Sequence, residues 1–451
     1  MEHPPGSAAS TRDARWQGGL GLIGEMRRQP GITRAEAARR QGLSTGSATE
    51  IVSRLRRLSL VDEVPAPSGA RGRPTSVLVP HPDGPVVLAI DLRHNGWESA
   101  YALLDGEPKP LASGAVAGQD PGRVVARLAS AVAWARRRFG GRLRAVSVAV
   151  AATVRDSRVV QFDTFRWEDV DLAGIVTGGL PLLVGNDATL AGVAEARRGA
   201  AKATRTSLHL TVLVGVGGIL VVDGAPVAGA TGAAGEFGHL PFGDPSSECP
   251  SCGAKGCWDL QVDGRALARL LGDPAPPDPY RYTTEVIAAA EGDDWARAAV
   301  AHVAGALGRG IAGLVNAYDP EVVTLGGLGP QLVGTAEEAF QNSYRQGLMR
   351  FRRGSPPPII AAAYRQDGPL RGAIELGLDL VVCEAGLSAW SAEQGPGHRT
   401  TGSAGRVDRP RTVPQELVTG SEMYEASHRA RNQEHQEQRK SNGNKRAEAP
   451  R

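Results

Sequence analysis

Four residues that bind metal ions well lie close together in the stretch 235–260, GEFGHLPFGDPSSECPSCGAKGCWDL. His239, Cys249, Cys252 and Cys257 follow the spacing H-x9-C-x2-C-x4-C. Thiolates and imidazole are the ligands that zinc prefers, and four of them complete a tetrahedron without leaving a position for a reacting water. We therefore expect a structural Zn²⁺ ion here rather than a hydrolytic metal.

The C-x-x-C pair in this stretch also has a redox interpretation. No thioredoxin-like strand and helix surround it, which favours metal binding. Gly253 and Gly256 fit the tight turns needed to aim neighbouring sulfurs at one ion. The fourth cysteine, Cys383, lies in the apolar run LDLVVCEAG and is expected to be a buried apolar side chain.

Residues 12–82 are expected to form a winged helix-turn-helix domain. Thr33-x-x-Glu36 is a capping box that opens a second helix, and Ser44 can cap a third. The third helix carries one apolar stripe at helical spacing, followed by the β-prone runs LVDEV and TSVLV around PAPSGARGRP. Two helices joined by a short turn and followed by a hairpin are typical of DNA-binding domains.

The outward face of the third helix and the tip of the hairpin carry the candidate DNA contacts. Short polar side chains near the helix start would let backbone amides approach phosphates closely. Arginines in a Gly- and Pro-rich tip could enter a narrow minor groove, where the negative potential is focused. The candidates are Thr45, Ser47, Thr49 and Arg54 on the helix and Arg71 and Arg73 at the tip. The alternative is an ordinary helix pair followed by a linker.

Residues 86–386 are expected to form a large α/β body. Three strand-like runs, a helix and a further strand occur in the first half of this region, and the same pattern recurs in the second half. The repetition lies in the pattern and not in the residues. It predicts two lobes of related α/β design.

Residues 387–451 are polar, charged and nearly free of large apolar side chains, so we expect a disordered basic tail. The net charge of the chain is only +3, with basic ends and an acidic middle. The tail could add weak electrostatic affinity for DNA or serve only as a solvated extension. We find no apolar run of the about eighteen residues that a membrane span requires and no signal peptide, which predicts a cytoplasmic protein with no membrane partner.

Two segments carry a family resemblance. GAAGEFGH, followed by the cysteine cluster ending in CGAKGCWDL, resembles the signature of the ROK family (repressor, open reading frame, kinase), and so does VGNDATLAGVAEARRGAA. The resemblance covers about residues 12–386, because family repressors also carry an N-terminal winged helix-turn-helix. It implies a two-lobed, actin-like ATPase (ribonuclease H-like) body that phosphorylates sugars in the kinases and senses sugars in the repressors, which usually form dimers or higher oligomers.

The resemblance also implies a sugar site made of Asn186, Asp187, Glu236, His239 and Asp259. Carboxylates and an amide suit polyol hydroxyls, and an imidazole can bind zinc through one nitrogen and a hydroxyl through the other. In the kinases of the family the aspartate that matches Asp187 is the general base. The alternative for the segment GND is a turn with an Asx cap.

The chain departs from the pattern of the ATP-using members in its Gly-rich loops. Their D-x-G-x-T turn is here DLRHNG, with Asp91 retained but Arg93 and His94 in the permissive positions. The second loop is VGVGGI without its threonine, while LGGLG resembles the nucleotide-side loop only weakly. In the sugar site Thr164 stands at the family's usual Asn position, Asp259 replaces a glutamate, and C-x-x-C replaces C-x-C.

These features lead us to expect a DNA-binding transcriptional regulator, a repressor of carbohydrate metabolism that senses a sugar or sugar derivative. Its kinase-like domain would be non-catalytic, with degraded ATP loops, and its partners would be operator DNA, the effector and a second copy of the chain. One alternative is an active ROK-type sugar kinase with a fused DNA-binding domain. Another is a ligand-independent regulator with a decayed sugar site.

Overall fold

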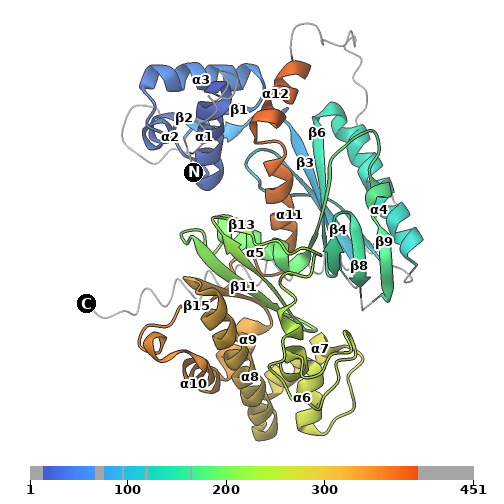
Figure 1. Cartoon of the computed structure of the whole chain (residues 1–451). Coiled ribbons are helices and arrows are strands. Elements are labelled where there is room, and N and C mark those ends of the chain that lie inside the picture. Colours follow the sequence, from blue (N-terminus) through green and yellow to red (C-terminus); the bar gives the residue numbers. More distant parts are fainter. Residues whose placement is uncertain (1–13, 67–75, 94–95, 117–119, 163–164, 395–451) are drawn as a thin grey trace, which may run out of the picture.

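The first lobe of the body is built on a five-stranded sheet (Figure 1). In the order β10-β6-β3-β4-β5, the strands β3, β4 and β5 pair antiparallel, while β6 and β10 continue parallel to β3. The strands are β3 (Val86–Arg93), β4 (Gly96–Ala102), β5 (Lys109–Ala115), β6 (Leu143–Val150) and β10 (Leu182–Asn186). The computed structural model that gives this fold describes residues 14–66, 76–93, 96–116, 120–162 and 165–394.

The second lobe repeats this topology. Its order is β15-β14-β11-β12-β13, with β11, β12 and β13 antiparallel and β14 and β15 parallel to β11. The strands are β11 (Thr206–Val212), β12 (Val216–Val222), β13 (Ala225–Pro226), β14 (Val322–Gly327) and β15 (Ile359–Ala361). The repeated pattern that the sequence predicts, and the two lobes it implies, are therefore confirmed.

Helices cover both faces of the first sheet. The fully buried strand β3 sends alternate side chains to opposite faces, as period-two geometry requires. Leu88 and Ile90 share a core with α4 (Pro121–Phe139), whereas Val87 shares a core with α11 (Gly368–Asp379). A strand buried on both sides explains why its sequence is an apolar run without alternation.

The second sheet is covered in the same way. Leu208 and Leu210 of β11 pack in one core with the long helix α8 (Asp294–Tyr318). Helix α5 (Asp187–Arg197) follows the last strand of the first sheet and packs on β11 and β12 of the second. One helix thus belongs to the interface between the two lobes.

Helix α8 is long and apolar enough to cross a membrane by length and composition alone, which corrects the expectation that no such run exists. Its most apolar window is 72% buried inside the second lobe. This is the environment of a core helix, and among the described residues no other helix meets the same criterion.

The remaining body elements extend the two lobes. A three-stranded antiparallel sheet, β7-β8-β9, follows β6, and four shorter helices surround α8. These elements are β7 (Thr153–Arg155), β8 (Arg158–Phe162), β9 (Trp167–Asp171), α6 (Gly264–Leu271), α7 (Pro279–Ala289), α9 (Gly329–Thr335) and α10 (Glu337–Gly347).

The N-terminal domain has the three helices and the hairpin that the sequence predicts. Thr33 Oγ1 accepts a hydrogen bond from Glu36 N, and Ser44 Oγ accepts one from Ser47 N, so both predicted N-caps are confirmed. The hairpin strands pair antiparallel. The elements are α1 (Ala14–Arg28), α2 (Arg34–Arg40), α3 (Thr45–Arg57), β1 (Val61–Pro65) and β2 (Ser76–Pro80).

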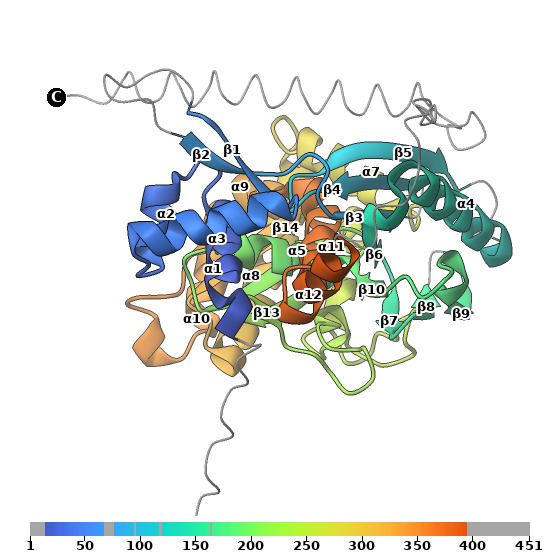
Figure 2. The ribbon, with the colours of Figure 1, turned by 90° about the horizontal axis from the view of Figure 1, so that it is seen from above.

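A last helix, α12 (Glu384–Glu393), joins the N-terminal domain to the body (Figure 2). Trp390 is fully buried and its Nε1 donates to Leu58 O at 2.6 Å, while Trp16 Nε1 donates to Ser388 Oγ at 2.8 Å. The predicted tail is therefore wrong for residues 387–394, which are helical and packed. The rest of that tail lies outside the described residues.

Cys383 also differs from its expected role. It is only partly buried and forms the N-cap of α12, where its Sγ accepts from Gly386 N at 3.3 Å. The apolar run that precedes it spans the last turn of α11 and the turn that follows, where Leu378 and Val381 are buried in the core of the first lobe.

Candidate functional site

The four predicted metal ligands come together in one cluster. One ligand atom from each of His239, Cys249, Cys252 and Cys257 lies within 4.8 Å of the others. Cys249 Sγ is 3.9 Å from His239 Nδ1, and Cys252 Sγ is 3.5 Å from Cys257 Sγ. Ligands of one zinc ion at about 2.3 Å stand about 3.8 Å apart in a tetrahedron, so the cluster fits one such ion.

Glycines shape the loop that presents the sulfurs. Gly253 and Gly256 have φ of +73° and +77°, as the sequence predicts for tight turns at these positions. Cys249 N donates to Ala254 O at 2.7 Å and Gly253 N donates to Cys249 O at 2.9 Å, which closes the turn between the first two sulfurs. The backbone hydrogen bonds of this loop thus help to position the cysteines.

The thiols crowd one another. Burial, and then the neighbouring thiols Cys252 and Cys249, raise the pKa of Cys257 to about 12. A cation that binds three such sulfurs must displace their protons, so metal affinity at this cluster depends on pH.

The end of the metal loop is anchored in the core of the second lobe. Trp258, in the short helix after Cys257, is fully buried and its Nε1 donates to Ala306 O at 3.1 Å. A side chain at Gly310 of α8 would lie 2.1 Å from the indole ring, so only glycine fits there. The cluster is therefore held against α8.

Asn186 ends β10 and caps α5. Its Oδ1 accepts from Thr189 N at 3.0 Å, and its Nδ2 donates to Ala152 O at 3.2 Å. The Asx-cap interpretation of GND is therefore what the structure shows. The amide retains one N–H for a further partner, and the positive end of the helix dipole lies at the same place.

Asp187 opens α5 next to other acids. Its Oδ1 accepts from Ala188 N at 2.8 Å. Burial, and then the charge of Asp91, raise the pKa of Asp187 to about 7. Burial also raises the pKa of Asp91, which is fully inaccessible, to about 6. Raised carboxyl pKa values of this kind are common at functional sites.

Arg93 fills the position where the sequence predicts a damaged phosphate loop. Its Nε donates to Asp91 Oδ2 at 2.7 Å, and its Nη2 lies 2.7 Å from Glu98 Oε1. The same Nη2 donates to Gln366 O at 2.9 Å, just before α11. Although burial opposes it, the charges of these two acids raise the pKa of Arg93. His94 and Thr164 lie outside the described residues.

Glu236 and Asp259 each accept a hydrogen bond from another segment of the body. Thr153 Oγ1 of the first lobe donates to Glu236 Oε1 at 2.7 Å. Asp259 Oδ1 accepts from Val216 N at 2.6 Å, in the loop that lacks its family threonine. Burial raises the pKa of Asp259 to about 6, against the effect of that hydrogen bond. The shortened acid therefore contacts the loop that follows β11.

Three of the four predicted DNA contacts on α3 are exposed: Thr45, Ser47 and Thr49. Arg54 is partly buried, and its guanidinium lies 4.9 Å from the ring centroid of Trp16, so it packs within the domain and not on its outward face. Arg71 and Arg73 lie outside the described residues, and their role remains a prediction.

Sequence reasoning missed the partners of these residues. The partners of Arg93 and Glu236 include Glu98 and Thr153, single polar residues in strands with no motif around them. The signal in the sequence was charge. Arg93 follows Asp91 by two residues, and a guanidinium near a buried strand end must either pair with a carboxylate or extend into solvent.

The sequence profile of the ROK family matches residues 96–379 of the chain. A glucokinase from Streptomyces coelicolor is 28% identical over an alignment of 311 positions, which covers 64% of this chain and 97% of that enzyme. This match spans nearly the whole enzyme, and the family profile leaves both ends of this chain outside.

Two solved structures show the same fold. A ROK family transcriptional regulator, described as a homolog of the E. coli MLC protein, gives a TM-score of 0.66 at 22% identity and covers 84% of this chain and 99% of its own. A ROK hexokinase from Thermus thermophilus gives a TM-score of 0.54 at 30% identity and covers 66% and 99%. Kinases and a regulator therefore share this actin-like body.

Proposed function

Because the chain belongs to the ROK family, we propose that it is a DNA-binding transcriptional regulator, a repressor, whose kinase-like body binds a sugar or sugar derivative. The observation that carries the proposal is the N-terminal domain of three helices and a hairpin, docked on the body through α12. The larger share of the chain covered by the regulator, 84% against 66% for the hexokinase, supports it.

The ion pairs of Arg93 favour a sensor over an enzyme. A phosphate loop needs backbone amides that a phosphate can approach, whereas here a guanidinium paired with Asp91 and Glu98 occupies the strand end. An arginine already neutralised by two acids is a poor partner for a phosphate. We therefore infer that the body does not phosphorylate its sugar.

The sugar site would use the groups around the start of α5. The free N–H of Asn186 and the carboxyls of Asp187 and Glu236 suit hydroxyl groups. His239 would bind zinc through Nδ1, the nitrogen that faces Cys249, and offer Nε2 to the ligand. In this proposal zinc fixes the direction of the imidazole, and the protein acts in the cytoplasm as a dimer or higher oligomer.

Binding to DNA from upstream of the gene tests the proposal directly. Wild-type protein is expected to shift this DNA specifically at moderate salt. Thr45→Glu places a negative charge on the exposed start of α3 and is expected to weaken binding at least about tenfold, the range of one good contact. Thr284→Glu, on an exposed helix of the second lobe, is the matched control. Absence of specific binding by zinc-loaded wild type would reject the proposal.

The second candidate, an active sugar kinase, is favoured by Asp187 and by the glucokinase relative. A coupled assay of ATP turnover over hexoses and amino sugars decides between the two. We expect no turnover above background. Turnover that disappears in Asp187→Asn would make the protein an enzyme and overturn our preference.

A further inference from the structure

A buried carboxylate lies between the N-terminal domain and the body. Glu375 of α11 is 4% exposed. Its Oε2 is 2.7 Å from Arg27 Nη2, at the end of α1, and its Oε1 is 3.3 Å from Arg198 Nη1, which directly follows α5. Both arginine side chains are largely buried too, at 14% and 13% exposure. Two guanidinium groups from different parts of the protein therefore share one acid.

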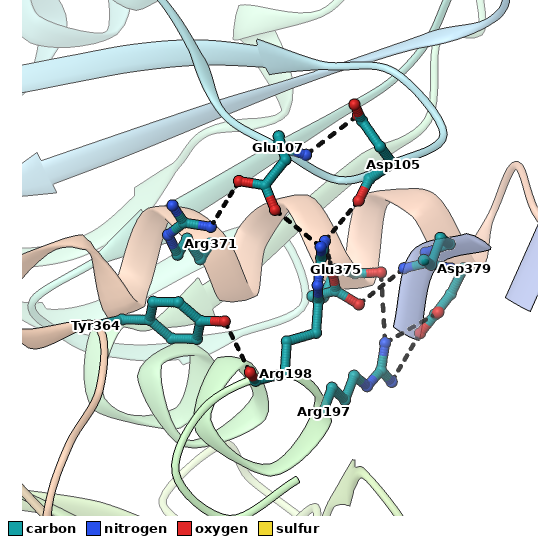
Figure 3. A network of polar contacts seen from close by, with 9 residues as sticks. Asp105, Glu107, Arg197, Arg198, Tyr364, Arg371, Glu375 and Asp379 are labelled. Atoms are coloured by element: carbon teal, nitrogen blue, oxygen red, sulfur yellow. Dashed lines mark hydrogen bonds and ion pairs between the residues drawn. The ribbon is translucent and has the colours of Figure 1, made fainter. Parts of the chain in front are cut away.

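Arg198 is positioned entirely by the body (Figure 3). Besides Glu375, its Nη1 donates to Asp105 O at 2.6 Å, and its Nη2 pairs with Glu107 Oε1 at 2.8 Å. Its backbone carbonyl accepts from Tyr364 Oη at 2.9 Å. All its polar partners in the described part of the chain are body residues, so it reaches α1 only through Glu375.

Helices α5 and α11 cross in close backbone contact. A Cβ at Gly372 of α11 would lie 1.8 Å from Leu190 O of α5, and one at Gly368 would lie 3.0 Å from the Ala191 side chain. Backbones packed this closely cannot slide past each other, so the two helices move together. Displacement of α5 therefore displaces α11, and with it Glu375.

Both helices also begin at the candidate sugar site. Asn186 and Asp187 cap and open α5. The charge of Asp91 acts on Asp187, and Arg93 pairs with Asp91. Arg93 also donates to Gln366 O, two residues before the start of α11. The polar cluster around Asp91 thus lies at the start of the two helices, and the cluster around Glu375 lies farther along both.

We infer that Glu375 communicates the state of the sugar site to the N-terminal domain, by sharing its carboxylate between Arg198 of the body and Arg27 of α1. This inference rests on the proposed function. Glu375 carries one negative charge between two guanidinium groups that repel each other, although Arg198 also pairs with Glu107. A small shift of α5 that tightens the Arg198 pair loosens the Arg27 pair, and the reverse shift holds α1 more firmly.

Substitution of Arg198 tests this coupling without knowledge of the effector. In Arg198→Gln the carboxylate is left to Arg27 alone, so hydrogen exchange of α1 amides is expected to slow by at least about threefold, a typical coupling between networked residues. Arg27→Gln is expected to speed the same exchange. In Arg27→Gln/Arg198→Gln the Arg198 change should have no further effect.

Arg371→Gln is the matched control. Arg371 pairs with Glu107 Oε2 at 3.3 Å in the same network but forms no ion pair with Glu375 in the described part of the chain. It should leave α1 exchange unchanged. Thermal unfolding verifies that each variant is folded, and Arg198→Lys, which keeps the charge, should behave closer to wild type.

Titration of upstream DNA provides the functional readout. If the protein binds DNA, Arg198→Gln should change the apparent Kd at least about threefold, and only when Arg27 is present. Additive effects of the two substitutions, or unchanged α1 exchange in Arg198→Gln, would overturn the inference. Loss of the proposed function looks different: wild type would not bind DNA, while the exchange experiment would still report the coupling.

Discussion

The acids of the candidate sugar site are held where burial disfavours their charge. Asp187, Asp91 and Asp259 have pKa values raised to about 7, 6 and 6, respectively. A carboxyl group that serves only stability is expected to have a pKa lowered by its partners, as Asp169 does beside Arg158. The raised values mark side chains kept at a cost to the free energy of unfolding.

Asp187→Asn should therefore stabilise the protein in a pH-dependent way. The folded protein retains this proton to about pH 7, whereas the unfolded chain releases it near 3.8, so wild-type stability falls as pH rises through that window. The variant has no proton to release at this position, so its stability does not decrease for this reason. At pH 8 we expect an unfolding temperature about 2 °C or more above wild type, and a smaller difference at pH 5.

Calorimetry at the two pH values measures this effect. Asp169→Asn is the control, because that exposed acid has a lowered pKa and should give no gain at pH 8. An equal gain for Asp187→Asn at both pH values would show that removal of charge is not its cause.

Substitution by serine should have different effects at the metal cluster and at Cys383. Cys249→Ser removes one ligand of the metal cluster and is expected to lower bound zinc from about one ion per chain to a small fraction of that. Cys383→Ser should retain the metal, since Cys383 only caps α12 and serine is a good N-cap. Metal analysis of purified protein checks both, and full zinc in Cys249→Ser would contradict the assignment of the ligands.

Local chemistry explains which residues could be predicted. Thr33 and Ser44 act on amides within their own helices, and the metal ligands lie within one loop, so their spacing carries the signal. Arg54 was expected to face outward because helical spacing says nothing about a long side chain that turns back over Trp16.

At the scale of elements, the crossing of α5 and α11 leaves no room for a side chain. Gly372→Ala would place a methyl group 1.8 Å from Leu190 O, so the helices must separate. We expect a loss of about 2–3 kcal/mol in the free energy of unfolding, typical of overpacking. Denaturant unfolding measures it.

Gly334→Ala is the control for this substitution. Gly334 lies in α9, and a methyl group added to it would have no described atom within 4 Å. Because alanine also favours helix, this variant should be neutral or slightly more stable than wild type. Equal losses in the two variants would show that the crossing is not the sensitive feature.

The repeated pattern of strands and helices could be predicted because most of the longer strands have their own apolar run. Helix α12 could not, because it has a cysteine in place of a usual N-cap and only Leu387 and Trp390 as fully buried anchors. In a polar segment two such residues are too few to reveal helical periodicity. The missed element is therefore the one whose stability comes from distant contacts.

At the scale of the whole molecule, the N-terminal domain and the first lobe share one core. Trp16 and Leu55 of the domain, Val87 of β3, Ile374 of α11 and Trp390 of α12 belong to the same buried cluster. The sequence predicts the N-terminal helices and hairpin and the two lobes of the body. It does not predict this docking, since the docking is made by residues more than 300 positions apart. The domain therefore packs directly on the body.

Shortening the chain distinguishes the predicted boundary from the observed one. A protein that ends at Gln394 should unfold like the full chain. One that ends at Gly386 loses Leu387 and Trp390 and is expected to lose about 3–5 kcal/mol, the cost of removing a buried tryptophan. Thermal unfolding compares them, and equal stability of the two would mean that α12 does not contribute to the shared core.

The position of α12 also orders events during synthesis. The Trp16 side of α1 receives its partner Ser388 only after 372 further positions have been translated. At about 5–20 residues per second this takes roughly 20–75 seconds, far longer than helices need to form. A nascent or prematurely ended chain thus keeps this apolar surface open to chaperones and proteases until α12 has been synthesised.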